Sequence, residues 1–378
     1  MQNYRLIDNL LNGVGVKLQL DKTRRDRVEQ SYKAVSDWLD KDDSIANGAP
    51  FNIYPQGSYR LGTTVRPILG NEYDLDFVIE VQMSWNSSID AMAFLKQIYN
   101  CLRENDVYKD KVELKNRCVR VNYKDDFHMD ILPSYPVGRV GNSNVKVPDR
   151  KTEYWKDSAP KGYADWFEDC CKYLSVLFEK AAKVEELPEE TPFEMKPPLK
   201  RAVQLIKRFR DIYFEDMPDK APISIVLTTL AGLHYNKSES VFLTIKYILN
   251  TIAKEINKAD KMIEVYNPVN PAEKLSERWD TDKSLYTSFK YFIGVFNQQW
   301  MELENTLEKG LPAIKTKLEE LFGETVATEV LTEYANFINR NRQSSTLGVS
   351  STGGLLTGLS SKGKETVSTV ARNNFYGG

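Results

Sequence analysis

Two aspartates share one side of a strand that the sequence predicts near residue 75. In the run YDLDFVIE, Asp74 and Asp76 alternate with Leu75, Phe77 and Ile79. Because alternate side chains of a strand face opposite sides, the apolar set packs on one face and the two acids lie together on the other. Neighbouring carboxylates raise each other's pKa unless a cation lies between them, and a hard divalent cation with oxygen ligands is the usual partner. The pair therefore predicts a Mg²⁺ site.

A third acid lies in a later predicted strand, FHMDILP. Asp130 stands there between apolar residues, where an unpaired carboxylate is costly to bury, whereas Asp125 and Asp126 are explained as turn residues. Three carboxylates on neighbouring strands hold two cations about 3.5 to 4 Å apart, one activating a hydroxyl and one binding a triphosphate and its leaving group. Asp74, Asp76 and Asp130 thus predict phosphoryl or nucleotidyl transfer with two Mg²⁺ ions, Mn²⁺ being an alternative ion.

The segment QGSYRLGT, upstream of the acids, predicts the phosphate-binding half of the site. Gly57 lets backbone N–H groups approach a phosphate, the Ser58 hydroxyl can donate a hydrogen bond to it, and Gln56 offers a further polar contact. Two acids at this spacing, or a lone Gly-Ser pair, are common at strand edges and turns. The prediction therefore depends on the order and spacing of the three features together.

Two regions of different periodicity must position these residues. Over residues 1–160, apolar residues at helical spacing predict helices at 21–39 and 88–103, and short β-like runs predict strands at 74–81, 111–115, 117–123 and 127–133. Over residues 161–342 the pattern is helical, with helices expected near 163–183, 198–214, 222–234, 240–258, 282–305 and 307–340. A mixed α/β lobe followed by an all-helical lobe is expected.

The final segment, residues 343–378, is dominated by Ser, Thr and Gly. It offers too few large apolar side chains to offset the entropy of ordering it, so a flexible tail is expected. The sequence shows no internal repeat.

Composition excludes several classes of protein. The 378 residues carry 51 Lys and Arg against 53 Asp and Glu, a net charge of −2, so no global field draws the chain to nucleic acid or an anionic membrane. The chain has four cysteines, none of them in a C-x-x-C pair, and only two histidines, so no zinc cluster is expected. No apolar run reaches the roughly 18 residues of a membrane span, and no export signal is seen. A cytoplasmic protein is expected.

The motifs resemble those of the DNA polymerase β-like nucleotidyltransferases: QGSYRLGT, then YDLDFVI, then a strand aspartate. The branch that the chain is similar to is the cGAS/DncV-like nucleotidyltransferases (CD-NTases), relatives of oligoadenylate synthase. The helical half also resembles that family in LKRAVQLIKRFRDIYF, APISIVLTTLAGL and VYNPVNPAEKLSERW. The resemblance implies an α+β fold, with a polymerase β-like nucleotidyltransferase lobe, an oligoadenylate synthase-like helical lobe and a cleft between them.

The resemblance also implies roles for individual residues. Asp74, Asp76 and Asp130 would be the metal ligands, with Asp130 helping to activate the acceptor hydroxyl. Gln56, Gly57 and Ser58 would contact the donor triphosphate, and so would one lysine and one serine of the helical lobe, for which Lys207 and Ser224 fit best. The other basic residues of that helix are interpreted as solvated charges, namely Lys200, Arg201, Arg208 and Arg210. His128 and His234 receive no role.

For the reaction, the resemblance implies that ATP and other ribonucleoside triphosphates are joined and cyclised with release of pyrophosphate. The product would be a cyclic di- or trinucleotide that activates a separate effector in CBASS anti-phage defence. The animal DNA sensor of this superfamily carries a zinc thumb, and the sequence has neither its His/Cys spacing nor a basic balance. Duplex DNA is therefore not expected as an activator.

The last two residues, Gly377 and Gly378, follow a flexible segment and resemble the end of ubiquitin-like proteins. Some CBASS operons encode an E1/E2-like enzyme that conjugates the cyclase through its terminal glycine. An unhindered glycine on a long arm can reach an adenylating site and then a thioester, so conjugation of Gly378 is predicted.

Two alternatives remain open at this point. One is a template-independent nucleotidyltransferase that adds nucleotides to RNA, protein or a small molecule. The other is a catalytically silent scaffold that binds nucleotide, against which three mutually repelling carboxylates argue. The base, ring size and linkage of the product are not determined by the sequence.

Overall fold

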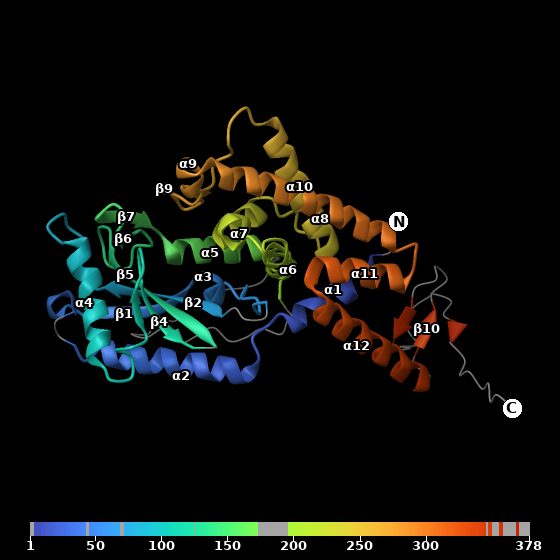
Figure 1. Ribbon diagram of the computed structural model, residues 1–378, viewed down its shortest axis with the longest axis horizontal. Coiled ribbons are helices and arrows are strands. Elements are labelled where there is room, and N and C mark those ends of the chain that lie inside the picture. The colour runs from blue at the N-terminus through green and yellow to red at the C-terminus, as the bar shows by residue number, and fades with distance from the viewer. Residues whose placement is uncertain are drawn as a thin grey trace.

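The structure is a computed structural model that describes residues 4–42, 45–68, 72–124, 126–172 and 196–344, with three short segments at 347–349, 355–357 and 368–369. Figure 1 shows two parts side by side: a sheet with helices, and a larger helical assembly. The mixed α/β and helical regions that the sequence predicts are both present, in the expected order.

A seven-stranded sheet forms the first part, with the main order β1-β2-β5-β4-β3 and with β6 joining β5 to β7. The central pair, β2 and β5, is parallel, and the other pairs are antiparallel. The strands are β1 (Phe51–Gln56), β2 (Tyr73–Val81), β3 (Val112–Leu114), β4 (Val119–Tyr123), β5 (Phe127–Pro136), β6 (Val145–Asp149) and β7 (Tyr154–Ser158). The four predicted strands are confirmed, and β1, β6 and β7 were not predicted.

One face of this sheet packs on two helices, α2 (Lys22–Leu39) and α4 (Ala91–Glu104), both close to their predicted bounds. Leu75, Phe77 and Ile79 of β2 are at most 1% exposed and belong to the apolar core shared with these helices. Because β2 alternates, its acids lie on the opposite face, as the sequence predicts. Burial of the apolar face therefore fixes the direction in which the acids point.

Eight helices and a hairpin follow in the described part of the chain. The helices are α5 (Pro160–Cys171), α6 (Pro198–Tyr213), α7 (Ser224–Leu233), α8 (Val241–Lys258), α9 (Arg278–Thr281), α10 (Lys283–Thr306), α11 (Leu311–Phe322) and α12 (Glu324–Gln343), and the hairpin pairs β8 (Tyr266–Asn267) with β9 (Asn270–Lys274). Short helical turns elsewhere are η1 (Ile45–Gly48), α3 (Gly57–Arg60) and η3 (Pro218–Lys220).

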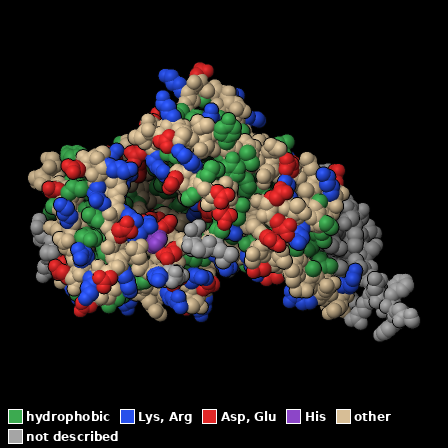
Figure 2. All heavy atoms as spheres, in the orientation of Figure 1, with side chains coloured by type: hydrophobic (Ala, Val, Ile, Leu, Met, Phe, Trp, Pro, Cys, Tyr) green, Lys and Arg blue, Asp and Glu red, His purple; other side chains and the backbone are tan. Residues whose placement is uncertain are grey.

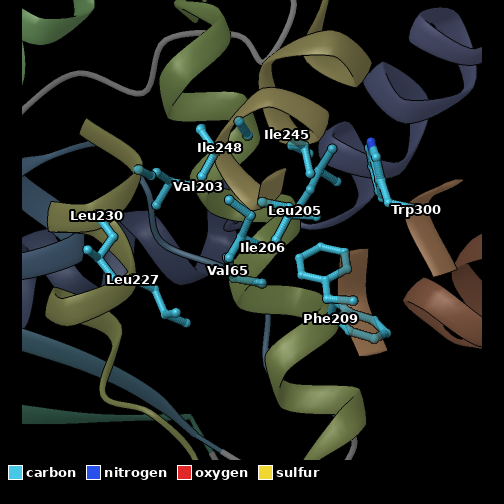
Figure 3. Close-up of a cluster of buried hydrophobic side chains, with 14 of the residues drawn as sticks. Val65, Val203, Leu205, Ile206, Phe209, Leu227, Leu230, Ile245, Ile248 and Trp300 are labelled. Carbon is cyan, nitrogen blue, oxygen red and sulfur yellow. The ribbon is translucent and has the colours of Figure 1, made fainter. Parts of the chain in front are cut away.

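Helix α6 runs through the centre of the helical core, which Figure 3 shows in close-up. Phe209 of α6 stacks on Phe296 with ring centroids 4.2 Å apart. Trp300 is fully buried, and its indole N–H donates to the carbonyl oxygen of Phe242 at 3.1 Å. A helix surrounded in this way by packed aromatic rings is a rigid support for any polar side chain on its remaining face.

One predicted helix is wrong in detail, and one helix was missed. The single helix expected over 307–340 is two helices, because Gly323 adopts φ +93°, a left-handed conformation that cannot continue a helix. Helix α1 (Arg5–Lys17) was not predicted, and its buried residues Ile7, Leu10 and Val14 belong to the helical core. The first helix of the chain thus packs with the second part, although residues 1–160 were assigned to the first lobe.

Some predictions fall on residues that the structure does not describe. The helix expected over 163–183 is described only as far as Cys171, and residues 173–195 lie outside the described ranges. In the predicted tail, β10 (Leu347–Val349) pairs with both β11 (Leu355–Thr357) and β12 (Ser368–Thr369). Gly378 lies outside the described residues. None of the helices in the described ranges has the length and apolar character of a membrane span.

Candidate functional site

Four polar residues form a row across the sheet. Strand pairing sets Gln56 of β1 opposite Asp76 of β2, Asp76 opposite Asp130 of β5, and Asp130 opposite Arg120 of β4. Paired residues of neighbouring strands project from the same face, here the face away from α2 and α4. Asp74 lies two residues before Asp76 on β2, so its side chain projects from the same face. The fold thus brings the three predicted acids together, although 54 positions separate Asp76 from Asp130.

Arg120 connects two of the acids. Its Nε donates to Asp130 Oδ1 at 2.6 Å and its Nη2 to Asp130 Oδ2 at 2.8 Å, a bidentate pair. The same Nη2 donates to Asp74 Oδ1 at 3.2 Å. The guanidinium therefore lies between Asp74 and Asp130 on the sheet face, a position that the sequence did not predict for it.

The acids perturb one another. Burial, together with the negative charges of Asp130 and Asp74, raises the pKa of Asp76 to about 7, although Lys207 and Arg120 oppose the shift. Loss of water on the cleft side also raises the pKa of Asp74, although its side chain is 64% exposed, and Arg120 opposes the shift. Excess negative charge in a partly buried site is the condition that a bound cation relieves.

The donor set fits a hard divalent cation. Three carboxylates on adjacent strands supply the oxygen ligands that Mg²⁺ and Mn²⁺ prefer. As the structure stands, no group of three Asp, Glu, His or Cys side chains among the described residues is arranged to hold a metal ion. The Arg120 guanidinium contacts both Asp74 and Asp130. Asp74, Asp76 and Asp130 remain the residues that would bind the ions.

Gly57 lies against one of these acids. It has φ +60° and opens the one-turn helix α3 directly after β1. A Cβ at this position would lie only 2.3 Å from Asp76 Oδ2, so no other residue fits without displacing the carboxylate. The Ser58 hydroxyl follows, 3.4 Å from the hydroxyl of Thr64. The Gly-Ser turn and the acids, predicted as two halves of one site, are in direct contact.

A cavity of about 910 Å³ opens in front of this row, between the sheet and helices α6 and α7. Figure 2 shows the hollow, with acidic and basic side chains gathered around it. Every predicted site residue that the structure describes lines it: Gln56, Gly57, Ser58, Asp74, Asp76, Asp130, Lys207 and Ser224. The sequence therefore identified residues of both walls of one cleft.

The helical wall carries two cations that lie one turn apart on α6. Lys207 is buried, and its Nζ donates to the carbonyl oxygen of Thr63 at 3.0 Å. Burial, with the nearby charge of Arg210, lowers the pKa of Lys207 to about 8. Arg210 Nη1 donates to the Ser224 hydroxyl at 2.5 Å. Arg210, which the sequence interpretation left as a solvated charge, is thus the cation in contact with Ser224.

Three further basic residues of α6 are also not solvated as predicted. Lys200 pairs with Glu168 at 2.6 Å, Arg201 donates to Asn12 Oδ1 at 2.8 Å, and Arg208 donates to the carbonyl oxygen of Phe322 at 3.1 Å. These contacts attach α6 to α5, α1 and α11. The charges support the helix that forms the cleft wall.

The far end of the cavity is formed by contacts between the two parts. Arg117 pairs with Asp149 at 2.7 Å and is also hydrogen-bonded to Glu277, which precedes α9. Glu273 of β9 accepts from the Ser158 hydroxyl at 2.9 Å and from the Ala159 N–H at 3.1 Å. The sequence named the segment that contains Glu273 and Glu277 but assigned no role to either. Long-range partners of this kind have no local sequence signal.

Comparison with known proteins decides the family. Residues 9–170 match the family model described as Second Messenger Oligonucleotide or Dinucleotide Synthetase domain. A c-di-GMP synthase of Roseivirga ehrenbergii is 33% identical over 373 residues, covering 98% of this chain and 97% of that protein. The chain belongs to the cGAS/DncV-like nucleotidyltransferases. The resemblance drawn from the motifs is confirmed, and so is the prediction of a nucleotidyltransferase.

Similar proteins and structures agree with this CD-NTase assignment. The cyclic dinucleotide synthase CdnG of Bradyrhizobium diazoefficiens is 26% identical over 388 residues, covering 92% of this chain and 88% of that protein. The structure of CdnG in complex with GTP matches with a TM-score of 0.72, at 22% identity over 88% of this chain and 100% of that one. Escherichia coli DncV, in a 3'-deoxy GTP bound form, matches with a TM-score of 0.60, at 19% identity over 82% and 93% of the two chains. The α+β fold is confirmed.

Replacement of Gly57 tests the contact between the Gly-Ser turn and the acids. In Gly57→Ala the added Cβ meets Asp76 Oδ2, so we expect the carboxylate to move by about 1 Å and pyrophosphate release from nucleoside triphosphates to fall roughly 100-fold. Gly62→Ala is the matched control, because Gly62 has φ +65° but its Cβ would meet only Lys200 atoms at 3.9 Å. Both variants should lose about 1–2 kcal/mol of stability to the left-handed backbone. Equal activity in the two variants would contradict the proposed contact.

The lowered pKa of Lys207 predicts how stability depends on pH. Below about pH 8 the folded protein must hold a buried ammonium that the unfolded chain holds in water. Between about pH 8 and the unfolded value of 10.5, the unfolded state binds more protons, so stability rises with pH. Lys207→Met should therefore raise the free energy of unfolding at pH 7 by about 2 kcal/mol, after loss of the bond to Thr63.

Denaturation by guanidinium chloride at pH 7 and pH 9.5 measures this effect. The advantage of Lys207→Met over the wild type should shrink at pH 9.5, where the native lysine is largely neutral. Lys220→Met is the control, since Lys220 is half-exposed and pairs with Asp282 at 3.3 Å. A Lys207→Met variant that is less stable than the wild type at pH 7 would contradict the prediction.

Proposed function

We propose that this CD-NTase joins ribonucleoside triphosphates and cyclises them into a cyclic di- or trinucleotide, using two divalent cations, Mg²⁺ first and Mn²⁺ as the alternative. One observation carries the proposal: Asp76 and Asp130 lie opposite each other at the floor of a cleft, with Asp74 beside them. The relatives named c-di-GMP synthase and cyclic dinucleotide synthase support a cyclic product. GTP is accordingly the first substrate to test, followed by ATP and mixtures of the two.

Each wall of the cleft has a part in the reaction. Two divalent cations held by the acids would neutralise triphosphate charge and lower the pKa of the attacking hydroxyl. Ser58, Lys207 and Arg210 bind the donor triphosphate, and Asp130 accepts the proton of the acceptor hydroxyl. The new phosphodiester forms at the α-phosphorus as the bond to pyrophosphate breaks. For a dinucleotide, a second such transfer within the linear product closes the ring and releases the second pyrophosphate. A trinucleotide needs three transfers and releases three pyrophosphates.

The size of the cleft favours nucleotides over a polymer as the acceptor. At about 910 Å³ the cavity is at the upper end of the range of about 300–1,000 Å³ that is typical for one small-molecule site. Arg117 and Glu273, which make contacts between the two parts, line it. Transfer to RNA, protein or a small molecule remains the alternative, with a silent scaffold as the second.

Isosteric replacement of an acid tests the proposal. Asp76→Asn keeps the shape of the side chain but removes a ligand charge, so we expect product formation to fall by at least about 1,000-fold, or about 4 kcal/mol of transition-state stabilisation. Asp106→Asn is the control, because Asp106 is exposed and pairs only locally with Lys109. Purified protein is incubated with GTP, ATP or both and with Mg²⁺, and phosphatase-resistant product is identified by mass spectrometry.

The possible products separate the three functions. A cyclic nucleotide resists phosphatase because it has no terminal phosphate. Label from a nucleoside triphosphate on RNA, protein or a small acceptor would favour the alternative transferase. Nucleotide binding without any pyrophosphate release would favour the scaffold. An Asp76→Asn variant with normal product yield would show that the acid row is not the catalytic site.

We further propose that the enzyme acts in the cytoplasm in CBASS anti-phage defence, where its product activates a separate effector protein. Membership in the CD-NTases supports this role. The Ser-, Thr- and Gly-rich segment and the terminal Gly377–Gly378 pair support conjugation by an E1/E2-like enzyme. Since an adenylating enzyme acts on a terminal carboxylate, conjugation would form an isopeptide bond from Gly378 to a lysine of the target.

Conjugation has a direct test. Coexpression with an E1/E2-like enzyme from the same operon should give a Gly378 isopeptide that mass spectrometry detects after proteolysis. Gly378→Glu should abolish the adduct while leaving basal product formation unchanged, since the site residues lie in the cleft. Unmodified wild-type protein beside an enzyme that is active on a reference substrate would contradict the proposal.

A further inference from the structure

Arg120 is attached to the acid cluster in two ways that differ in strength. Its bidentate pair with Asp130 uses both carboxylate oxygens, at 2.6 and 2.8 Å, and the Asp130 side chain is only 15% exposed. Its contact with Asp74 is a single bond at 3.2 Å to a side chain that is 64% exposed. Short, bidentate and shielded pairs are stronger than long, exposed ones. The contact with Asp74 is therefore the one that breaks first.

The two contacts also use different hydrogens of the guanidinium. Nε–H and one Nη2–H hold Asp130, and the other Nη2–H reaches Asp74. Asp74 can consequently leave without loss of the pair with Asp130. The pairing of β4 with β5 sets Arg120 directly opposite Asp130, so the retained contact is fixed by the sheet itself.

We propose that Arg120 is a positioning residue that occupies the place of a cation between Asp74 and Asp130. When a divalent cation binds, Arg120 loses its contact with Asp74. Its bidentate pair with Asp130 then keeps that carboxylate oriented. The proposal rests on the metal-dependent transfer proposed above. The guanidinium stays protonated at any ordinary pH, so it gives way by losing a contact and not by losing its charge. Divalent cations must therefore compete with Arg120 for Asp74.

Charge and geometry can be separated by two substitutions. Arg120→Gln removes the competing charge, so we expect Mn²⁺ to bind roughly tenfold more tightly in the absence of nucleotide. Arg120→Lys keeps the positive charge but replaces the planar guanidinium by an ammonium group. The Mn²⁺ affinity should therefore stay near that of the wild type. Both variants lose the bidentate hold on Asp130. In both, kcat for pyrophosphate release should fall, with little change in KM.

Electron paramagnetic resonance of free Mn²⁺ measures the affinity directly on the full chain. Lys115→Gln is the matched control, because it removes one positive charge near the same strands from a residue that pairs with Glu113 and does not line the cleft. Its Mn²⁺ affinity and kcat should equal those of the wild type. Circular dichroism and thermal unfolding establish that each variant is folded. If Arg120→Gln does not fold, Arg120→Lys alone tests the proposal. That variant should then show normal Mn²⁺ affinity together with a reduced kcat.

Two results would overturn the proposal. Mn²⁺ affinity in folded Arg120→Gln that equals or falls below the wild-type value would exclude competition for Asp74. An unchanged kcat in Arg120→Lys would exclude a positioning role at Asp130. Failure of the proposed function would appear differently, as wild-type protein that binds Mn²⁺ yet forms no cyclic nucleotide, because the binding measurement needs no substrate.

Discussion

The parallel pairing of β2 with β5 is the constraint on which the site depends. It sets Asp76 opposite Asp130 and Asp74 opposite His128, so a shift of one residue would turn one set of acids into the apolar core. That core fixes the register, since Leu75 and Phe77 on β2 and Met129 and Ile131 on β5 are at most 1% exposed. The acids are thus held together, against their mutual repulsion, by hydrophobic burial on the opposite face.

Helix α6 has the corresponding role in the helical part. Phe209 belongs to the aromatic core, whereas Lys207 and Arg210 on the same helix line the cleft. A buried ammonium costs stability, as its lowered pKa shows, and the packed aromatic rings supply the free energy that offsets this cost. The helix therefore places a destabilising cation where a triphosphate would relieve it.

The sequence predicted those features that local patterns encode. Alternation over YDLDFVIE placed both acids on one face, and helical spacing placed most of the helices within a few residues. It did not predict α1 as part of the helical core, because the helices that α1 packs on, α6, α8 and α12, begin at residue 198 or later. Arg120 and Arg210 were missed for a different reason, since their partners are only 10 and 14 residues away. Their roles come from strand pairing with Asp130 and from contact with Ser224, which no spacing along the chain reveals.

The two walls of the cleft differ in charge: the sheet wall carries the acids, whereas the helical wall carries both signs, with Lys207 and Arg210 beside Asp211 and Glu215. Acids from β2 and β5 form the sheet wall, and Lys207 with Arg210 forms part of the helical wall. A triphosphate is an anion that the acids of the sheet wall repel unless cations bind first, whereas Lys207 on the helical wall would attract it directly. Arg120 lowers the net charge of the sheet wall in the meantime, which lets three carboxylates stay close together in a folded protein. In the proposed reaction, metal and nucleotide would replace these charge contacts by their own.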